Sequence, residues 1–201
     1  MRRFSPSIAA IPSPEERLQD RQGKLNLLVV GGSLGALALN ETVPAAIARM
    51  MPEDRPRVMH QVGRGKLETT RQQYQQLGLH ADCMEFIEDM ASAYAWADLV
   101  ICRAGAMTVA EIAAAGVVAV FVPYPYAIYD HQTLNARFLS DQEAAFLMPQ
   151  EQFTAERLSA LLAELTEDRA RLLELSLRAR QSALPDATRK VADICNEVMH
   201  A

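Results

Sequence analysis

The stretch ADLVICRAGAMTVAEIAAAG (residues 97–116) decides the fold. Its apolar run DLVIC (98–102) has the length and composition of a buried parallel strand. Gly105 permits a turn, and an alanine-rich helix follows it. Strand, glycine turn and helix in this order predict one repeat of an alternating α/β fold.

The same alternation continues along most of the chain. Strands that alternate with helices form a parallel sheet covered on both faces, so we predict an α/β fold with a Rossmann-like parallel sheet of about six strands. Right-handed crossovers bring the carboxyl ends of the strands to one edge, where ligands of such sheets bind. Strands are expected at residues 25–30, 57–62, 83–87, 98–102, 117–123 and 144–149, with further helices at 37–51, 66–77, 89–97, 131–140 and 154–182.

The start of the chain is predicted to be an extended, linker-like segment. Pro6, Pro12 and Pro14 argue against a helix before Glu15, because proline restricts both itself and the residue before it. The expected division is a link-like segment at 1–24, a ligand-binding domain at 25–184 and a final helix at 185–201.

Composition excludes several classes of protein. The formal net charge of −5 gives no electrostatic reason to expect nucleic acid as a partner. Cys83, Cys102 and Cys195 form no CxxC pair, so neither a zinc site nor a disulfide framework is indicated, and reduced thiols of a cytosolic protein fit best. No apolar run approaches the roughly 20 residues that span a bilayer. The first residues lack the long apolar core of a signal peptide.

The loop GGSLG (31–35) joins a predicted strand to a predicted helix. Glycines let the backbone approach a ligand, and the helix N-terminus offers free N–H groups to an anion such as phosphate. The spacing matches neither GxGxxG nor a Walker loop. The alternative is a tight turn with Ser33 as the N-cap of the helix.

The segment FIEDM (86–90) follows the third predicted strand. The backbone of Ile87 could bind the edge of a base, and Asp89 could cap the next helix. A strand that ends in Phe-Ile more often belongs to the core, which leaves both interpretations open.

Thr108 and Glu111 have the spacing of a capping box at the start of the alanine-rich helix. This pattern explains Glu111 without a ligand, and the local rules favour it. In the alternative, the loop amides from Ala106 to Val109 face phosphate and Glu111 accepts hydrogen bonds from a ribose diol.

A polar cluster, Asp130, His131 and Gln132, follows the fifth predicted strand. Three adjacent hydrogen-bonding groups on such a loop could bind a polyol such as a sugar. In the alternative, Asp130 or Thr133 begins a helix and His131 is a surface residue.

Together the loops are more specific than any one of them. GGSLGA (31–36), FIEDMASAYAWADLVICRAGAMTVAEIAAAG (86–116) and VPYPYAIYDHQTLNA (122–136) occur in this order and spacing. They closely resemble the C-terminal half of the MurG family of bacterial N-acetylglucosaminyltransferases. The similarity runs from about residue 1 to the end, and PDATRKVAD (185–193) resembles the family's last helix.

The resemblance implies one half of a two-domain GT-B glycosyltransferase that works without a metal or cofactor and inverts the anomeric carbon. N-acetylglucosamine would pass from UDP-N-acetylglucosamine to lipid I, forming lipid II for peptidoglycan. The complete enzyme would associate peripherally with the inner face of the bacterial plasma membrane.

Residue roles also follow from the resemblance. Arg2 resembles the arginine of the family's interdomain link, although its spacing to PSPEERL (12–18) is longer here. The positions that match the donor site are Ser33 (diphosphate), Ile87 (uracil, through its backbone), Ala106, Met107, Thr108, Val109 and Ala110 (phosphates and ribose), Glu111 (ribose hydroxyls), and Gln132 with His131 (sugar).

Two positions depart from the family pattern. Val118 stands where proline is common, which should affect only the start of a strand. Tyr129 stands where an acid is common, which could alter the sugar side of the pocket.

The family's N-terminal half, with a GGTGGH-like loop, a base histidine and the lipid site, has no counterpart in this sequence. Deprotonating the acceptor needs a positioned base. We therefore expect the chain to bind UDP-N-acetylglucosamine, if weakly, without transferring the sugar alone, and to bind lipid I only with an N-terminal half. The last GT-B helix crosses to the first domain, so Val191, Ile194 and Val198 would be exposed and residues 185–201 would self-associate or fray.

Two other functions compete with this interpretation. An NAD-binding module would need GxGxxG and an acid at the end of the second strand, whereas Glu53 and Asp54 precede that strand. A nucleotide-sugar-binding module without transferase activity is compatible with the same motifs.

Overall fold

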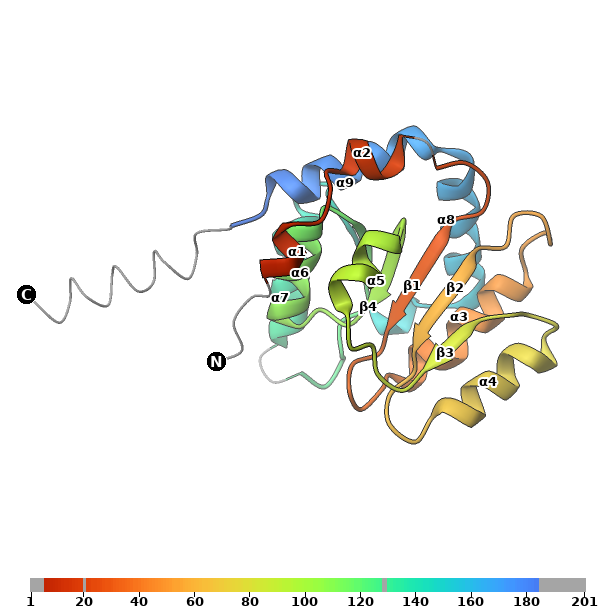
Figure 1. The fold of residues 1–201 in the computed structure, drawn as a ribbon. Coiled ribbons are helices and arrows are strands. Elements are labelled where there is room, and N and C mark those ends of the chain that lie inside the picture. The colour runs from red at the N-terminus through yellow and green to blue at the C-terminus, as the bar shows by residue number, and fades with distance from the viewer. Residues whose placement is uncertain (1–5, 20, 128–129, 185–201) are drawn as a thin grey trace, which may run out of the picture.

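A parallel sheet forms the centre of the domain (Figure 1). The computed structural model describes residues 6–19, 21–127 and 130–184, and within them six strands pair in the order β3-β2-β1-β4-β5-β6. Every pairing is parallel, which confirms the predicted α/β fold. The strands are β1 (Asn26–Val30), β2 (Arg57–Gln61), β3 (Asp82–Met84), β4 (Leu99–Cys102), β5 (Val118–Phe121) and β6 (Phe146–Leu147).

Helices cover both faces of the sheet (Figure 1). The helices are α1 (Pro6–Ala9), α2 (Pro14–Leu18), α3 (Leu37–Ala48), α4 (Leu67–Gln76), α5 (Met90–Trp96), α6 (Ala106–Ala115), α7 (His131–Ser140), the 3-10 helix η2 (Gln150–Gln152), α8 (Ala155–Glu167) and α9 (Arg169–Gln181).

Alternate strand residues enter two separate apolar cores. Val100 and Cys102 of β4 join the core under α5, α6 and α7. Leu99 and Ile101 of the same strand join the core under α3, α4 and α8. Because both faces are covered, β4 is apolar throughout, and this is why a continuous apolar run predicted it.

Some boundaries differ from the prediction. The third strand ends at Met84 rather than at 87. The helical segment predicted at 154–182 is divided at Asp168, whose carboxylate accepts a hydrogen bond from the Arg171 N–H at 2.9 Å and caps α9. Val118, one of the two departures from the family pattern, is the buried first residue of β5.

The prediction that no helix precedes Glu15 is wrong, because α1 spans Pro6–Ala9 and α2 begins at Pro14. Pro6 and Pro14 are each the first residue of a helix, where proline loses no hydrogen bond. Ile8 is 1% exposed and belongs to the same core as α6. Figure 1 shows α1 beside α6 and α2 beside α9, and residue contacts join both pairs.

Several predicted features lie outside the described residues. These are Arg2, Tyr129, and the final helix at 185–201 with Val191, Ile194 and Val198. In the part that is described, no helix is long and apolar enough to cross a membrane.

Candidate functional site

The glycine-rich loop 31–35 lies at the carboxyl end of β1. The Gly31 N–H donates to the Gln61 carbonyl at 3.1 Å, and the Gly35 N–H donates to the Gly32 carbonyl at 3.0 Å, closing a tight turn. Gly32 and Gly35 have φ angles of +78° and +69°, in the left-handed region that favours glycine. Ser33 is exposed in this turn.

Ser33 does not cap α3, so that interpretation was wrong. The N-cap position is Ala36, and no side chain there accepts a hydrogen bond from the first turn. A polar cap would have satisfied one of the free N–H groups of this helix end. Its absence leaves the N-terminus of α3 open to an anion.

Arg103 follows β4 directly and points across the same edge. Its guanidinium donates to the carbonyl oxygens of Val122 and Pro123 at 3.0 and 3.1 Å. A further N–H donates to Gln150 Oε1 at 2.7 Å, and the group lies 5.5 Å from the Tyr124 ring centroid. Burial lowers the pKa of Arg103.

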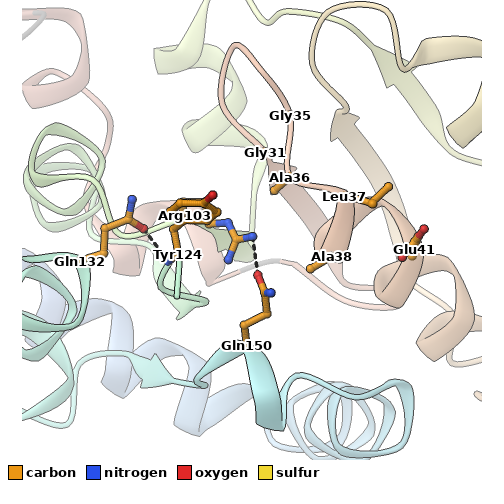
Figure 2. A pocket seen from close by; sticks show the side chains of 10 residues that line it. All are labelled: Gly31, Gly35, Ala36, Leu37, Ala38, Glu41, Arg103, Tyr124, Gln132 and Gln150. Atoms are coloured by element: carbon orange, nitrogen blue, oxygen red, sulfur yellow. Dashed lines mark hydrogen bonds between the residues drawn. The ribbon is translucent and has the colours of Figure 1, made fainter. Parts of the chain in front are cut away.

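These groups surround a cleft with a volume of about 460 Å³ (Figure 2). It spans the carboxyl ends of β1, β4 and β5, beside the point where the strand order reverses at β1. Ligands of open α/β sheets bind at such a point. The lining residues are Gly31, Gly35, Ala36, Leu37, Ala38, Glu41, Arg103, Tyr124, Gln132 and Gln150.

The polar cluster after β5 contributes one residue to the cleft. Gln132 lines it, and its Oε1 accepts a hydrogen bond from the Tyr124 N–H at 2.9 Å (Figure 2). His131 is the exposed first residue of α7 and does not line the cleft. Asp130 precedes α7, and its carboxylate accepts from the Thr133 hydroxyl at 2.6 Å rather than from a backbone N–H.

The predicted capping box of α6 is wrong. The helix begins at Ala106 after Gly105, so Thr108 lies inside the first turn and Glu111 lies one turn further along. The Tyr94 hydroxyl donates to Glu111 Oε2 at 3.1 Å instead. Burial raises the pKa of Glu111, and the hydrogen bond from Tyr94 opposes this rise.

The positions predicted for phosphates and ribose form the start of α6. No side chain caps this helix either. Met107 is 45% exposed and Val109 is buried. The residues in question are Ala106, Met107, Thr108, Val109 and Ala110, and they follow the carboxyl end of β4 without lining the cleft.

In the segment after β3, one apolar side chain is buried and its neighbour is exposed. Ile87 is 6% exposed and belongs to the core, as its apolar character predicted, whereas Phe86 is 57% exposed. Asp89 caps α5 by accepting from the Ser92 N–H at 3.0 Å, which confirms the predicted cap.

The cleft therefore unites the glycine-rich loop with Gln132, while Ile87 and Glu111 follow neighbouring strands at the same edge. The sequence assigned no role to Arg103, Tyr124 or Gln150. An arginine directly after a buried strand was the available signal, because a charged group there must lie at the ligand edge. Among the described residues, no group of three or more His, Cys, Asp or Glu side chains could hold a metal ion.

Curated proteins from several bacteria are similar to nearly the whole of this chain. The enzyme from Bordetella petrii called "UDP-N-acetylglucosamine--N-acetylmuramyl-(pentapeptide) pyrophosphoryl-undecaprenol N-acetylglucosamine transferase" is 54% identical over 190 residues, covering 94% of this chain and 53% of that protein. The protein of the same name from Dechloromonas aromatica is 51% identical over 193 residues, covering 96% of this chain and 54% of that protein. The chain thus spans about half the length of the curated relatives it matches.

Solved structures of glycosyltransferases are also similar to this chain. The crystal structure of Acinetobacter baumannii MurG superposes with a TM-score of 0.86 at 44% identity, covering 94% of this chain and 55% of that one. The glycosyltransferase WaaG, at 19% identity and a TM-score of 0.62, shares the fold. The resemblance to the C-terminal half of MurG is confirmed by these similarities.

The family model "Glycosyltransferase family 28 C-terminal domain" matches residues 26–194, which include the whole sheet and the cleft. The chain therefore belongs to glycosyltransferase family 28, as its C-terminal domain.

Proposed function

We propose that this domain binds UDP-N-acetylglucosamine and serves as the donor-binding half of a transferase that forms lipid II from lipid I. One observation carries the proposal. A cleft beside the uncapped N-terminus of α3 lies at the ligand edge of a domain that is 54% identical to a named N-acetylglucosamine transferase. The free N–H groups of such a helix end suit the diphosphate of a nucleotide sugar.

The parts of the donor can be assigned to the elements around that edge. The loop 31–35, with Ser33, would hold the diphosphate, and Gln132, with His131 beside it, would hold the sugar. The uridine would lie along the starts of α5 and α6, with Ile87 at the uracil, the backbone of 106–110 at phosphate and ribose, and Glu111 at the ribose hydroxyls. A carboxylate suits two neighbouring hydroxyl donors.

The transfer step needs more than this domain. Attack by the acceptor hydroxyl requires a base placed within hydrogen-bond reach, and exclusion of water requires closure of the cleft. We propose that both come from an N-terminal half, which would also bind lipid I. The complete enzyme would work in the cytoplasm, associated peripherally with the inner face of the plasma membrane.

An NAD-binding function is not favoured. The NAD fingerprint places an acidic residue at the end of the second strand for the ribose. Here β2 ends at Gln61, and Val62 and Gly63 follow it. Glu53 and Asp54 precede the strand, at the opposite edge of the sheet.

Two measurements on the 201-residue chain test the proposal. Calorimetric titration should detect UDP and UDP-N-acetylglucosamine but not NAD, because the site offers phosphate and sugar contacts without the NAD fingerprint. A lipid I assay should yield no lipid II from this chain alone. Preference for NAD would refute the donor assignment, and robust transfer would refute the need for a second half. A nucleotide-sugar-binding module without transferase activity would give the same titrations but no lipid II even when a relative's N-terminal half is added.

A further inference from the structure

A network of hydrogen-bonded, buried polar side chains lies behind the glycine-rich loop. The His60 ring, on β2, is completely buried, and its Nδ1 lies 3.0 Å from the Tyr74 hydroxyl of α4. Its Nε2 lies 3.1 Å from Oδ1 of Asn40 on α3. Tyr74 is 1% exposed and Asn40 is 2% exposed, so this network is out of reach of a ligand in the cleft.

The hydrogen bonds of Asn40 determine the tautomer of His60. Asn40 Nδ2 donates to the Val62 carbonyl at 3.1 Å, so Asn40 Oδ1 must accept from His60 Nε2–H. His60 Nδ1 then accepts from the Tyr74 hydroxyl. Burial lowers the pKa of His60 to about 3, which keeps the ring neutral in this tautomer near neutral pH. A buried network with all members satisfied is rigid.

The Val62 carbonyl is the point where this network meets the loop. A Cβ atom at Gly35 would lie only 2.1 Å from that oxygen, so the backbone of the loop packs against the backbone of Val62 with no room for a side chain. A Cβ at Gly63 would lie 2.2 Å from the Gly35 nitrogen. The Arg64 N–H also donates to the Ser33 carbonyl at 3.1 Å. The backbone at 62–64 therefore supports the loop, and the network holds that backbone in place.

We propose that Asn40, His60 and Tyr74 are positioning residues that set the geometry of loop 31–35 for a diphosphate. They act through the Val62 carbonyl and touch no ligand. The inference rests on the proposed function, because the loop is taken to hold the phosphates of the donor. Loss of one link should weaken the phosphate contacts and spare the nucleoside contacts, which come from α5 and α6.

The test compares UDP with uridine, which lacks the phosphates. Tyr74→Phe removes a hydroxyl that is linked to the Val62 carbonyl through three successive hydrogen bonds, and Asn40→Ala removes the direct link. Both should bind UDP roughly three- to tenfold more weakly, the equivalent of one lost hydrogen bond. Uridine affinity should stay within about twofold of the unsubstituted chain. Thr166→Val is the control, because it removes a hydroxyl that donates to the Leu162 carbonyl at 2.8 Å within α8.

Unchanged UDP affinity in Tyr74→Phe, or an equal loss of UDP and uridine affinity, would overturn the inference. If the unsubstituted chain binds neither ligand, the proposed function fails, and amide exchange then decides the inference by itself. The Gly35 and Arg64 N–H groups, which donate to Gly32 and Ser33, should exchange faster in Tyr74→Phe and not in Thr166→Val. Equal exchange in all three chains would contradict it.

Discussion

Glu111 is the residue whose interpretation the structure changes most. Its partner is the buried Tyr94 hydroxyl at 3.1 Å, and it has no part in starting its own helix. Burial raises the pKa of Glu111, so the folded chain binds a proton there more readily than the unfolded chain does. Ionised Glu111 thus costs stability, which suggests that it is retained for something other than folding.

The substitution Glu111→Gln distinguishes a role of Glu111 in stability from a role in binding the ribose. Because folding raises the pKa, the free energy of unfolding falls as pH rises from the ordinary glutamate pKa of about 4.3 through the folded value. Glutamine abolishes this loss and can still accept from Tyr94. We therefore expect unchanged or higher stability at pH 7, by urea unfolding, and uridine binding weakened roughly tenfold, the loss of one hydrogen bond to a charged group.

Glu156→Gln, an exposed site on α8, is the matched control and should change neither quantity. Lower stability of Glu111→Gln with intact uridine affinity would assign Glu111 a structural role.

The pH dependence of uridine binding is a second check on Glu111. Uridine has no phosphate that titrates between pH 4 and 7, so its affinity should fall with acidification as Glu111 becomes protonated. Tyr94→Phe should move that fall to higher pH, because the Tyr94 hydrogen bond lowers the pKa of Glu111.

At the scale of elements, the strands were predictable, whereas the starts of α3 and α6 at the ligand edge were not. Apolar runs located β1, β4 and β5, because a strand buried on both faces is apolar almost throughout. The segments predicted for β2 and β3 were also correct, although both strands carry polar residues. Rules for helix starts look for a polar cap, and they selected Ser33 and Thr108. The helices begin instead after Ala36 and Gly105 without a side-chain cap. Such failures of local rules are expected at functional sites, which supports the proposal that these N–H groups serve a ligand.

The loop between β1 and α3 offers a matched pair of glycines for a test. Gly32→Ala should cost about 1 kcal/mol, the strain of a left-handed φ, because a Cβ there meets nothing within 4 Å. Gly35→Ala adds the same strain and a contact of 2.1 Å with the Val62 carbonyl, which forces the loop to move. Urea unfolding and UDP titration should show the larger loss for Gly35→Ala in both quantities. Equal losses in the two variants would mean that the loop does not depend on its contact with residue 62.

At the scale of the whole molecule, the prediction for the start of the chain was wrong because the residues that this segment contacts are distant in the sequence. Nothing near Arg17 indicates that it donates to the Ala97 carbonyl at 2.8 Å and the Gly116 carbonyl at 2.5 Å, at the ends of α5 and α6. Arg21 donates nearby to Asp98, which is 1% exposed, at 2.7 Å. These arginines attach the start of the chain to the amino edge of the sheet, opposite the cleft.

If residues 6–19 belong to the domain, Arg17→Met should destabilise all of it. Burial first, then the charge of Arg21, lowers the pKa of Arg17 to about 10, so the guanidinium is still charged at pH 7. Its loss leaves two helix-end carbonyls without partners, while methionine avoids the cost of burying a charge. We expect a net loss of about 2–4 kcal/mol in the free energy of unfolding. Arg71→Met, which breaks only an exposed pair with Glu68, should cost less than about 1 kcal/mol. Similar, small losses in both variants would show that the segment is an attachment, because a linker can lose Arg17 without loosening α5 and α6.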